Sequence, residues 1–282
     1  MKKRLLALML AAAAALSLSG CSGQNNNSST AQNNGGEELT KVSIVLDWTP
    51  NTNHTGLYVA QKLGYYKEAG LEVEILPSPE GGASALVAAG GADFGIDCQD
   101  TLAPAFVGDD ALPVTAVAAL IQHNTSGIIS LADDGIQSPK DLEGKTYATW
   151  ENPVEQAIIK SLVEADGGDY SKINLIPSTV SDVITALNTN IDAVWIFYAW
   201  DGVATEVKGY DTNFLDFAKI DPTFDYYTPM IIANNSFLAE NPETAKAFLA
   251  ATAKGYEYAI ENSDAAADIL LEAAPELDPE IV

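Results

Sequence analysis

Residues 43–56 read SIVLDWTPNTNHTG, and this stretch decides how the rest of the chain is interpreted. Residues 43–46 are short and mostly apolar, which predicts the buried first strand of a parallel sheet. Polar and aromatic side chains follow, and a helix is expected after them. The turn from a strand into a helix at the carboxyl edge of an open α/β sheet is where such folds bind ligands. Trp48, Asn51 and His54 are therefore candidate ligand-binding residues.

The same stretch also has a purely structural interpretation. Asn and Thr before a helix are ordinary caps and turn formers, and a tryptophan after a strand is often part of the core. These residues alone do not decide between ligand binding and structure, so the decision rests on the remaining sequence.

The composition indicates a globular protein with an acidic surface. The chain has 282 residues, of which 47% are hydrophobic and 19% are charged, and this length is enough for two lobes of ordinary size. The formal net charge is −25. Such a charge argues against binding to nucleic acid and against a polybasic membrane contact.

The first 21 residues have the pattern of an export signal. Met1 to Arg4 is a positively charged start, Leu5 to Leu16 is an apolar run, and LSGC follows at residues 18–21. The run is too short for a membrane-spanning helix. The pattern resembles a bacterial lipoprotein signal, with residues 1–20 removed and lipid on Cys21; an ordinary cleaved secretory signal is the alternative. Residues 21–40 are rich in Asn, Ser and Gln, and they are expected to form a flexible tether to the outer face of the bacterial cell membrane.

Cysteine and histidine are scarce. With Cys21 lipidated, Cys98 is the remaining cysteine, so neither a disulfide nor a cysteine-based zinc site is expected. His54 and His123 are the only histidines, and nothing in the spacing indicates a catalytic dyad. We expect no metal and no cofactor, and we place His123 at a hinge or on the surface.

From residue 41 onward, predicted strands and helices alternate, which indicates an α/β fold. Strands are expected at 72–76, 92–97, 113–121, 127–131, 145–149, 173–177, 192–197, 213–218 and 230–233, and helices at 54–63, 83–89, 99–106, 180–188, 242–260 and from 263. Residues 85–97 and 186–197 show the same order of a predicted helix, a turn and a buried strand. The pattern predicts two βαβ lobes, with residues 41–125 and 228–282 in lobe 1 and residues 126–227 in lobe 2. Two crossings near 123–126 and 226–229 would join them around a ligand-binding cleft.

Further candidate residues lie where the predicted strands end. Gly81 and Gly82 would leave backbone N–H groups open at a helix start, which suits a negative or electron-rich group; a flexible turn is the alternative. Trp195 lies inside a strand and is expected in the core. The remaining candidates are Asp97, Trp150, Glu151, Tyr198, Trp200 and Asp201.

Five stretches carry a resemblance to a known group of proteins. They are LDWTPNTNHTGLYVA at 46–60, GYYKEAGLEV at 64–73, ADFGID at 92–97, DLEGKT at 141–146 and NPETAKAFL at 241–249. The chain from about residue 42 to its end resembles the type II periplasmic-binding-protein fold. The first stretch is the more specific one, and it resembles the thiamine-pyrimidine-precursor group of substrate-binding lipoproteins.

The resemblance implies an extracytoplasmic, monomeric receptor that delivers a pyrimidine to an ABC permease. The ligand would be 4-amino-5-hydroxymethyl-2-methylpyrimidine or its formylaminomethyl relative. Other binders of the same fold take sulfonates, taurine, nitrate or a riboflavin-like ring. A sulfonate binder is expected to have a cationic cleft, whereas the strand ends here carry carboxylates, aromatic rings and no arginine.

An enzyme is the third alternative. The eukaryotic pyrimidine synthase of this family consumes its own histidine and uses pyridoxal phosphate and iron, and His54 falls at that position. Lys62 would be the lysine nearest to the His54 loop. The enzyme's cysteine-rich run is matched here by residues 224–230, which contain no cysteine, so we expect a binder and no enzyme. Family members usually continue beyond residues 275–282 with another helix or two, so the chain is expected to be a fragment.

Overall fold

The computed structural model describes residues 38–107 and 111–282. The predicted signal peptide at 1–20 and the lipid site at Cys21 lie outside these residues, as does all but the end of the predicted tether at 21–40. Within the described part of the chain, the model contains no helix with the length and apolar character needed to cross a membrane.

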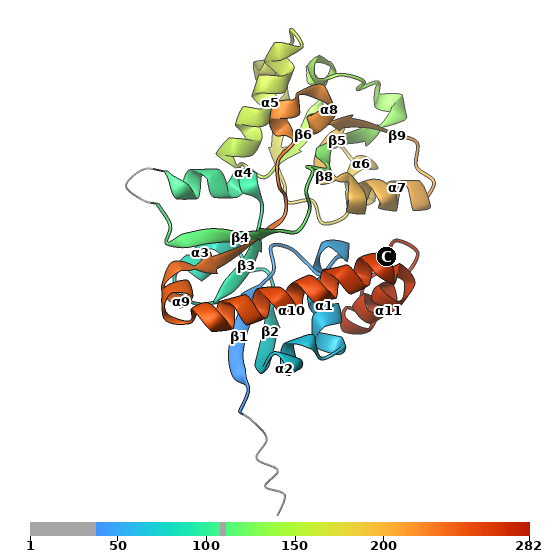
Figure 1. The fold of residues 1–282 in the computed structure, drawn as a ribbon. Helices are drawn as coiled ribbons and strands as arrows, with labels where there is room; N and C mark the ends of the chain where they lie inside the picture. The colour runs from blue at the N-terminus through green and yellow to red at the C-terminus, as the bar shows by residue number, and fades with distance from the viewer. Residues whose placement is uncertain (1–37, 108–110) are drawn as a thin grey trace, which may run out of the picture. The chain divides into compact units, whose positions relative to one another are not determined.

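Two five-stranded mixed sheets form the framework (Figure 1). The first has the order β2-β1-β3-β10-β4, with strands β1 (Thr40–Val45), β2 (Leu71–Leu76), β3 (Phe94–Asp97), β4 (Val114–Ala119) and β10 (Met230–Asn234). The second has the order β7-β6-β8-β5-β9, with strands β5 (Ser126–Leu131), β6 (Thr146–Thr149), β7 (Asn174–Pro177), β8 (Ala193–Phe197) and β9 (Thr212–Asp216).

The two sheets repeat one topology. In the first, β1 is parallel to β2 and β3, and β10 is antiparallel to β3 and β4. In the second, β6 is parallel to β7 and β8, and β5 is antiparallel to β8 and β9. The predicted α/β fold with two βαβ lobes is confirmed. The similar sequence patterns at 85–97 and 186–197 end in β3 and β8, which occupy equivalent positions in the two sheets.

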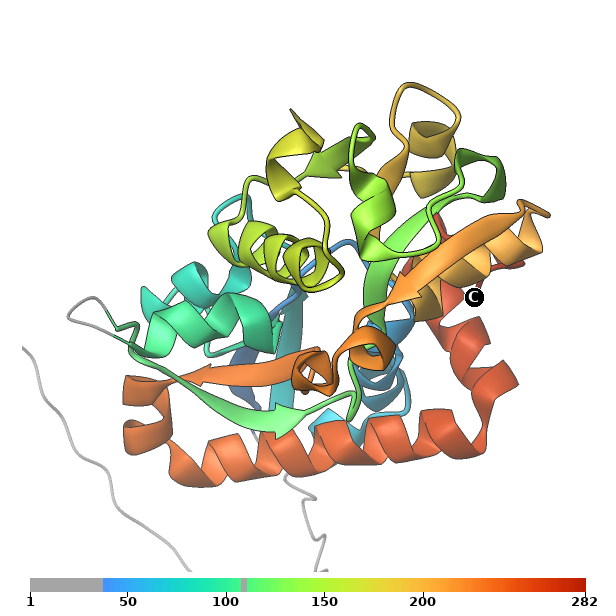
Figure 2. The same cartoon turned by 90° about the horizontal axis from the view of Figure 1, so that it is seen from above.

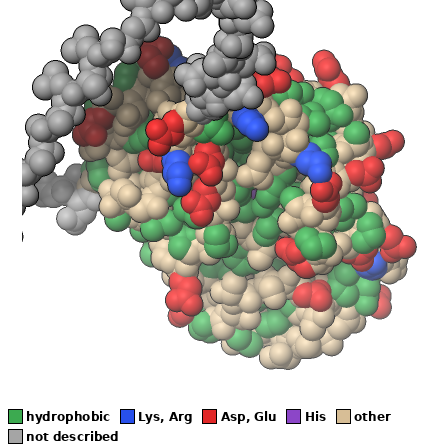
Figure 3. Space-filling view, turned by 90° about the horizontal axis from the view of Figure 1, so that it is seen from below, with side chains coloured by type: hydrophobic (Ala, Val, Ile, Leu, Met, Phe, Trp, Pro, Cys, Tyr) green, Lys and Arg blue, Asp and Glu red, His purple; other side chains and the backbone are tan. Residues whose placement is uncertain are grey.

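Helices cover both sheets. The first lobe carries α1 (Thr55–Lys62), α2 (Tyr65–Glu68), α3 (Ala83–Ala88), α4 (Gln99–Leu102), α9 (Asn235–Glu240), α10 (Pro242–Glu261) and α11 (Ser263–Ala273). The second carries α5 (Pro153–Ala165), α6 (Val183–Leu187), α7 (Val203–Val207) and α8 (Phe217–Ile220). Figure 2 shows the long α10 running along the first lobe, with α11 at its end. Acidic side chains are scattered over the face drawn in Figure 3, with few basic ones among them.

Helices α1 and α10 pack closely because two glycines face each other. A Cβ on Gly56 would lie 2.3 Å from the ring of Tyr256, and one on Gly255 would lie 2.0 Å from the carbonyl oxygen of Gly56. Tyr256 also donates its hydroxyl to the carbonyl of Asn53 at 2.7 Å. Helix α10 therefore supports the loop that follows β1.

Each lobe has its own aromatic core. In the first, Phe94 stacks on Phe248 with ring centroids 4.1 Å apart. In the second, Trp195 packs edge-on against Phe217 at 4.5 Å, and it is 3% exposed. The prediction that Trp195 is a core residue is confirmed.

Two segments connect the lobes, residues 120–125 and residues 221–229, which follow α8. They are tied to each other, since Asn124 donates its side-chain amide to the carbonyl of Phe224 at 2.9 Å. His123 is exposed beside them and lies 3.0 Å from Asp225. Strands of the first sheet come from residues 40–119 and 230–234, and those of the second from residues 126–216. The lobe boundaries at 125/126 and 227/228 remain predictions.

Some predicted element boundaries were wrong, and side-chain caps explain two of them. The strand predicted at 213–218 ends at Asp216, whose side chain accepts the backbone N–H of Lys219 and starts α8. The helix predicted from residue 180 starts at Val183, because Asp182 caps it by accepting the N–H of Thr185. The helix predicted at 99–106 is α4 followed by a 3-10 turn with Pro104 in it, where proline supplies no N–H.

Candidate ligand-binding site

The loop after β1 is held by His54. The Nδ1 atom of His54 accepts the backbone N–H of Asn51 at 3.2 Å, and Nε2 lies 2.8 Å from Oδ1 of Asp47. Because Nδ1 accepts, the ring proton is on Nε2 and is donated to Asp47. His54 is fully buried. Both of its ring nitrogens are therefore occupied within the loop, and it positions Asp47 instead of presenting a free nitrogen.

The other two candidates on this loop differ in exposure. Asn51 is buried, its Oδ1 accepts the N–H of Asn53, and its Nδ2 donates to the carbonyl of Thr49. The structure thus gives Asn51 a capping role. Trp48 is 41% exposed, so its ring is available for stacking.

The end of β3 brings Asp97 to the start of α3. Asp97 accepts the backbone N–H of Ser84 at 3.2 Å and that of Cys98 at 2.8 Å. The chain's own carboxylate thus uses a donor at the helix start where Gly81 and Gly82 were predicted to bind a ligand. Gly82 has a φ of 82°, a conformation that favours glycine. The turn interpretation of this pair accounts for that φ.

The end of β6 carries two exposed candidates. Trp150 is 39% exposed, and its ring lies 5.6 Å from that of Trp195. Glu151 is exposed and has a φ of 59°, which is uncommon outside glycine. Its backbone N–H is donated to Oγ1 of Thr149 at 3.0 Å.

Sequence reasoning missed Glu155, which organises this loop. Glu155 is 2% exposed and accepts the hydroxyls of Tyr147 at 2.6 Å and Thr149 at 3.0 Å, and also the N–H of Trp150. Burial raises the pKa of its carboxyl, while these hydrogen bonds oppose the rise. The signal was present in the sequence, because Glu155 lies on the buried face of α5 with Ile158, Ile159 and Leu162.

The end of β8 forms a π-helical turn, Tyr198–Gly202. Such turns often occur at functional sites. Tyr198 donates its hydroxyl to Glu206 and packs on Phe214 at 4.8 Å, while Trp200 is partly buried. Burial raises the pKa of Asp201 to about 6, and the charge of Asp182 adds to the rise.

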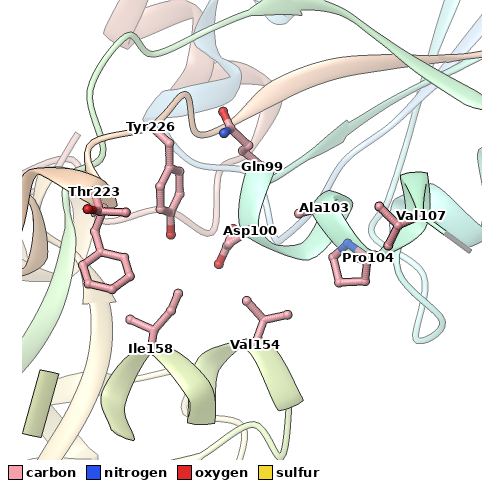
Figure 4. Close-up of a pocket in the computed structure, with 10 residues that line it drawn as sticks. Gln99, Asp100, Ala103, Pro104, Val107, Val154, Ile158, Thr223 and Tyr226 are labelled. Atoms are coloured by element: carbon pink, nitrogen blue, oxygen red, sulfur yellow. The ribbon is translucent and has the colours of Figure 1, made fainter. Parts of the chain in front are cut away.

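A cavity of about 520 Å³ lies between α4 of the first lobe and α5 of the second (Figure 4). None of the predicted site residues is among those that line it. The lining residues are Gln99, Asp100, Ala103, Pro104, Val107, Val154, Ile158, Thr223, Phe224 and Tyr226. The structure therefore adds the cavity residues as a second group of candidates. The ligand-binding roles of the strand-end residues remain predictions.

Comparison with known proteins decides the family. Residues 51–266 match the model of the family described as NMT1/THI5 like. The chain belongs to this family. A formylaminopyrimidine-binding protein from Halalkalibacterium halodurans is 33% identical over 238 residues, covering 83% of this chain and 71% of the relative. A 4-amino-5-hydroxymethyl-2-methylpyrimidine phosphate synthase from Legionella pneumophila is 27% identical over 247 residues, covering 84% and 75%.

Solved structures confirm the fold of this NMT1/THI5-like chain. The periplasmic aliphatic sulphonate binding protein from Escherichia coli has a TM-score of 0.67 at 15% identity, covering 86% of this chain and 81% of that one. A Candida albicans protein with the generic periplasmic-binding-protein fold has a TM-score of 0.58 at 17% identity, covering 83% and 76%. At these identities the likeness shows the fold alone.

The chemistry available to this family member is recognition by aromatic faces and carboxylates. Trp48 and Trp150 offer rings at two strand ends, and Asp100 and Asp201 offer partly buried carboxyls. Among the described residues, no group of three or more His, Cys, Asp or Glu side chains could hold a metal ion. The ten residues around the cavity include no Lys or Arg.

Proposed function

We propose that this chain is the extracytoplasmic solute-binding lipoprotein of an ABC importer. Its ligand is a thiamine pyrimidine precursor, either 4-amino-5-hydroxymethyl-2-methylpyrimidine or its formylaminomethyl relative, held between the two lobes. The observation that carries the proposal is the 33% identity to a formylaminopyrimidine-binding protein over 83% of this chain. Lipid on Cys21, a membrane permease as partner and a monomeric state belong to the same proposal.

The residues at the strand ends support a small aromatic ligand. Trp48 and Trp150 come from different lobes and are 41% and 39% exposed. Stacking of aromatic rings contributes about 0.5–1.5 kcal/mol per pair beyond burial. Binding would close the lobes about the two segments that join them, with no covalent chemistry.

A sulfonate, taurine or nitrate ligand is disfavoured by charge, although sulfonate-binding proteins share the fold. Arg4, in the predicted signal peptide, is the only arginine in the chain. The cavity residues include the carboxyl of Asp100 and no cation. An anion placed there would meet a like charge without a partner, which raises the free energy of the bound state.

An enzyme of the synthase type is the second candidate, because the Legionella relative carries that name. Here His54 is buried with both ring nitrogens occupied. Lys62 lies at the far end of α1, about 12 Å along the helix from His54, and pairs with Glu272 at 2.5 Å. These placements favour a binder over a site that engages His54 and Lys62 together.

Thermal unfolding with four ligands tests this proposal. The two pyrimidines, taurine and riboflavin would each be added to the purified chain in large excess. A pyrimidine at about 100 times its Kd should raise the Tm by about 5 °C or more, whereas taurine and riboflavin should leave it unchanged. A rise with taurine or riboflavin alone would contradict the proposal.

A further inference from the structure

Asp100 is an incompletely satisfied carboxyl in the wall of the inter-lobe cavity. Its Oδ1 atom is buried and, within the residues that the structure describes, has no hydrogen-bond partner. Burial raises the pKa of this carboxyl; the backbone N–H groups of Asp100 and Thr101 oppose the rise, and the nearby charge of Asp97 adds to it. A buried acceptor without a donor is destabilising, so a ligand that supplies the donor would recover that free energy.

The surroundings of Asp100 restrict the chemistry of that ligand. Figure 4 shows the carboxyl between Tyr226 on one side and Ile158 and Val154 of α5 on the other. The apolar side chains of α5 come from the opposite lobe, so they can contact the face of a ring while Asp100 contacts its edge. Burial, and then the charge of Asp100, raises the pKa of the partly buried Tyr226, so its hydroxyl stays a neutral donor.

An aminopyrimidine edge matches one carboxyl group. It presents an exocyclic N–H donor beside a ring nitrogen. A neutral carboxyl accepts the N–H with one oxygen and donates its O–H to the ring nitrogen; an ionised carboxyl makes the same pair with a ring that has taken up the proton. Either arrangement shares a single proton between the two groups.

We propose that Asp100 is the specificity-determining residue of this site and pairs with the 4-amino group and adjacent ring nitrogen of the pyrimidine. This assignment rests on the proposed function, and it adds a residue that the strand-end candidates do not include.

The substitution Asp100→Asn tests this role through the preference for one ligand over another, which a purely structural role of Asp100 would leave unchanged. The two ligands are 4-amino-5-hydroxymethyl-2-methylpyrimidine and its 4-oxo counterpart, which presents a ring N–H beside a carbonyl. The Asn amide can pair with either ligand, because it donates to the oxo carbonyl and accepts the ring N–H in one orientation, and in the other accepts the amino N–H and donates to the ring nitrogen. The amino ring can take up the shared proton and form a charge-assisted pair, which the 4-oxo ring cannot, so we expect the parent chain to prefer the amino ligand, on the order of 100-fold. Asp100→Asn should lose that preference, because its amide pairs with either ligand.

The controls separate this inference from the proposed function. Exposed Asp133 changed to Asn should keep the parental preference, and melting temperatures should show that each variant is folded. An unchanged preference in Asp100→Asn, or an equal loss for both ligands, would overturn the role of Asp100 while leaving the proposed function standing. If the parent chain binds neither pyrimidine, the proposed function and this inference both fail.

Discussion

The Nε2 atom of His54 lies 2.8 Å from Oδ1 of Asp47, while Nδ1 of the same ring accepts the N–H of Asn51. One buried side chain thereby joins the end of β1 to the start of α1. This relationship fixes the loop that presents Trp48, and it gives His54 a positioning role.

Replacing His54 with Ala should destabilise the fold. The change leaves the N–H of Asn51 and the carboxylate of Asp47 without their partner and opens a buried cavity, which together cost about 2–4 kcal/mol. Urea unfolding would measure the loss. Asp47→Asn keeps an acceptor oxygen for His54 and should cost less than His54→Ala. His123→Ala, at an exposed position, should stay within about 0.5 kcal/mol of the parent, and an equally small effect at His54 would contradict this role.

Glu155 provides a second test, on the loop after β6. Glu155→Ala should lower the free energy of unfolding by about 2–4 kcal/mol, because two buried hydroxyls and the N–H of Trp150 lose their acceptor. The matched control on the same helix is Glu164→Ala, whose side chain forms an exposed pair with Lys160 at 3.9 Å. That pair is worth about 0.5 kcal/mol or less. Similar losses for the two variants would disprove the role of Glu155.

Gly56 tests the packing of α1 on α10. A Cβ there would lie 2.3 Å from the Tyr256 ring, so Gly56→Ala should force the helices apart and cost about 1–3 kcal/mol or more. Gly81→Ala is the control, because a Cβ at Gly81 meets nothing within 4 Å. Denaturant midpoints would compare them, and a neutral Gly56→Ala would show that the close approach is absent in solution.

The raised pKa of Asp201 should make the free energy of unfolding depend on pH. Its pKa is raised from 3.8 to about 6 by burial and by Asp182. The folded chain therefore holds this proton more tightly than the unfolded chain, and the stability from this group is full below about pH 4 and lost as the pH rises through 6. At pH 7.5 the ionised carboxyl costs at most about 3 kcal/mol.

The substitution Asp201→Asn removes that titration. The variant should therefore gain stability over the parent as the pH is raised from 4 to 7.5, measured by urea unfolding at both values. Asp264→Asn, at an exposed position of α11, should show the same difference from the parent at both. A gain for Asp201→Asn that does not change with pH would refute this explanation.

Much of the fold could be read from local patterns. The apolar run at 43–46 and the core position of Trp195 follow from period and hydrophobicity alone. Helix caps were harder to predict from the sequence, because an aspartate can lie inside an element or at its end. Asp182 and Asp216 act as caps only because their side chains accept backbone N–H groups of the helices that follow. Polar side chains such as Asn51 and Asp97 suggested a ligand, yet in the structure they bond their own backbone.

The cavity could not be predicted in this way. Asp100 lies in a helix of four residues, too short for a periodic signal, and Val154 and Ile158 meet it only because the second lobe is placed opposite. Such contacts depend on how the crossings set the two lobes, which no short stretch of sequence encodes. Glu155 is the exception, because a glutamate on the apolar face of α5 is visible in the sequence.

Isothermal titration of the purified chain measures whether it reversibly binds a thiamine pyrimidine precursor. We expect one-to-one binding of 4-amino-5-hydroxymethyl-2-methylpyrimidine or its formylaminomethyl relative with a Kd below about 1 μM, equivalent to roughly −8 kcal/mol. The ligand should be recovered unchanged after unfolding of the complex. Absence of heat with both pyrimidines from a folded chain, or recovery of a chemically altered ligand, would contradict it.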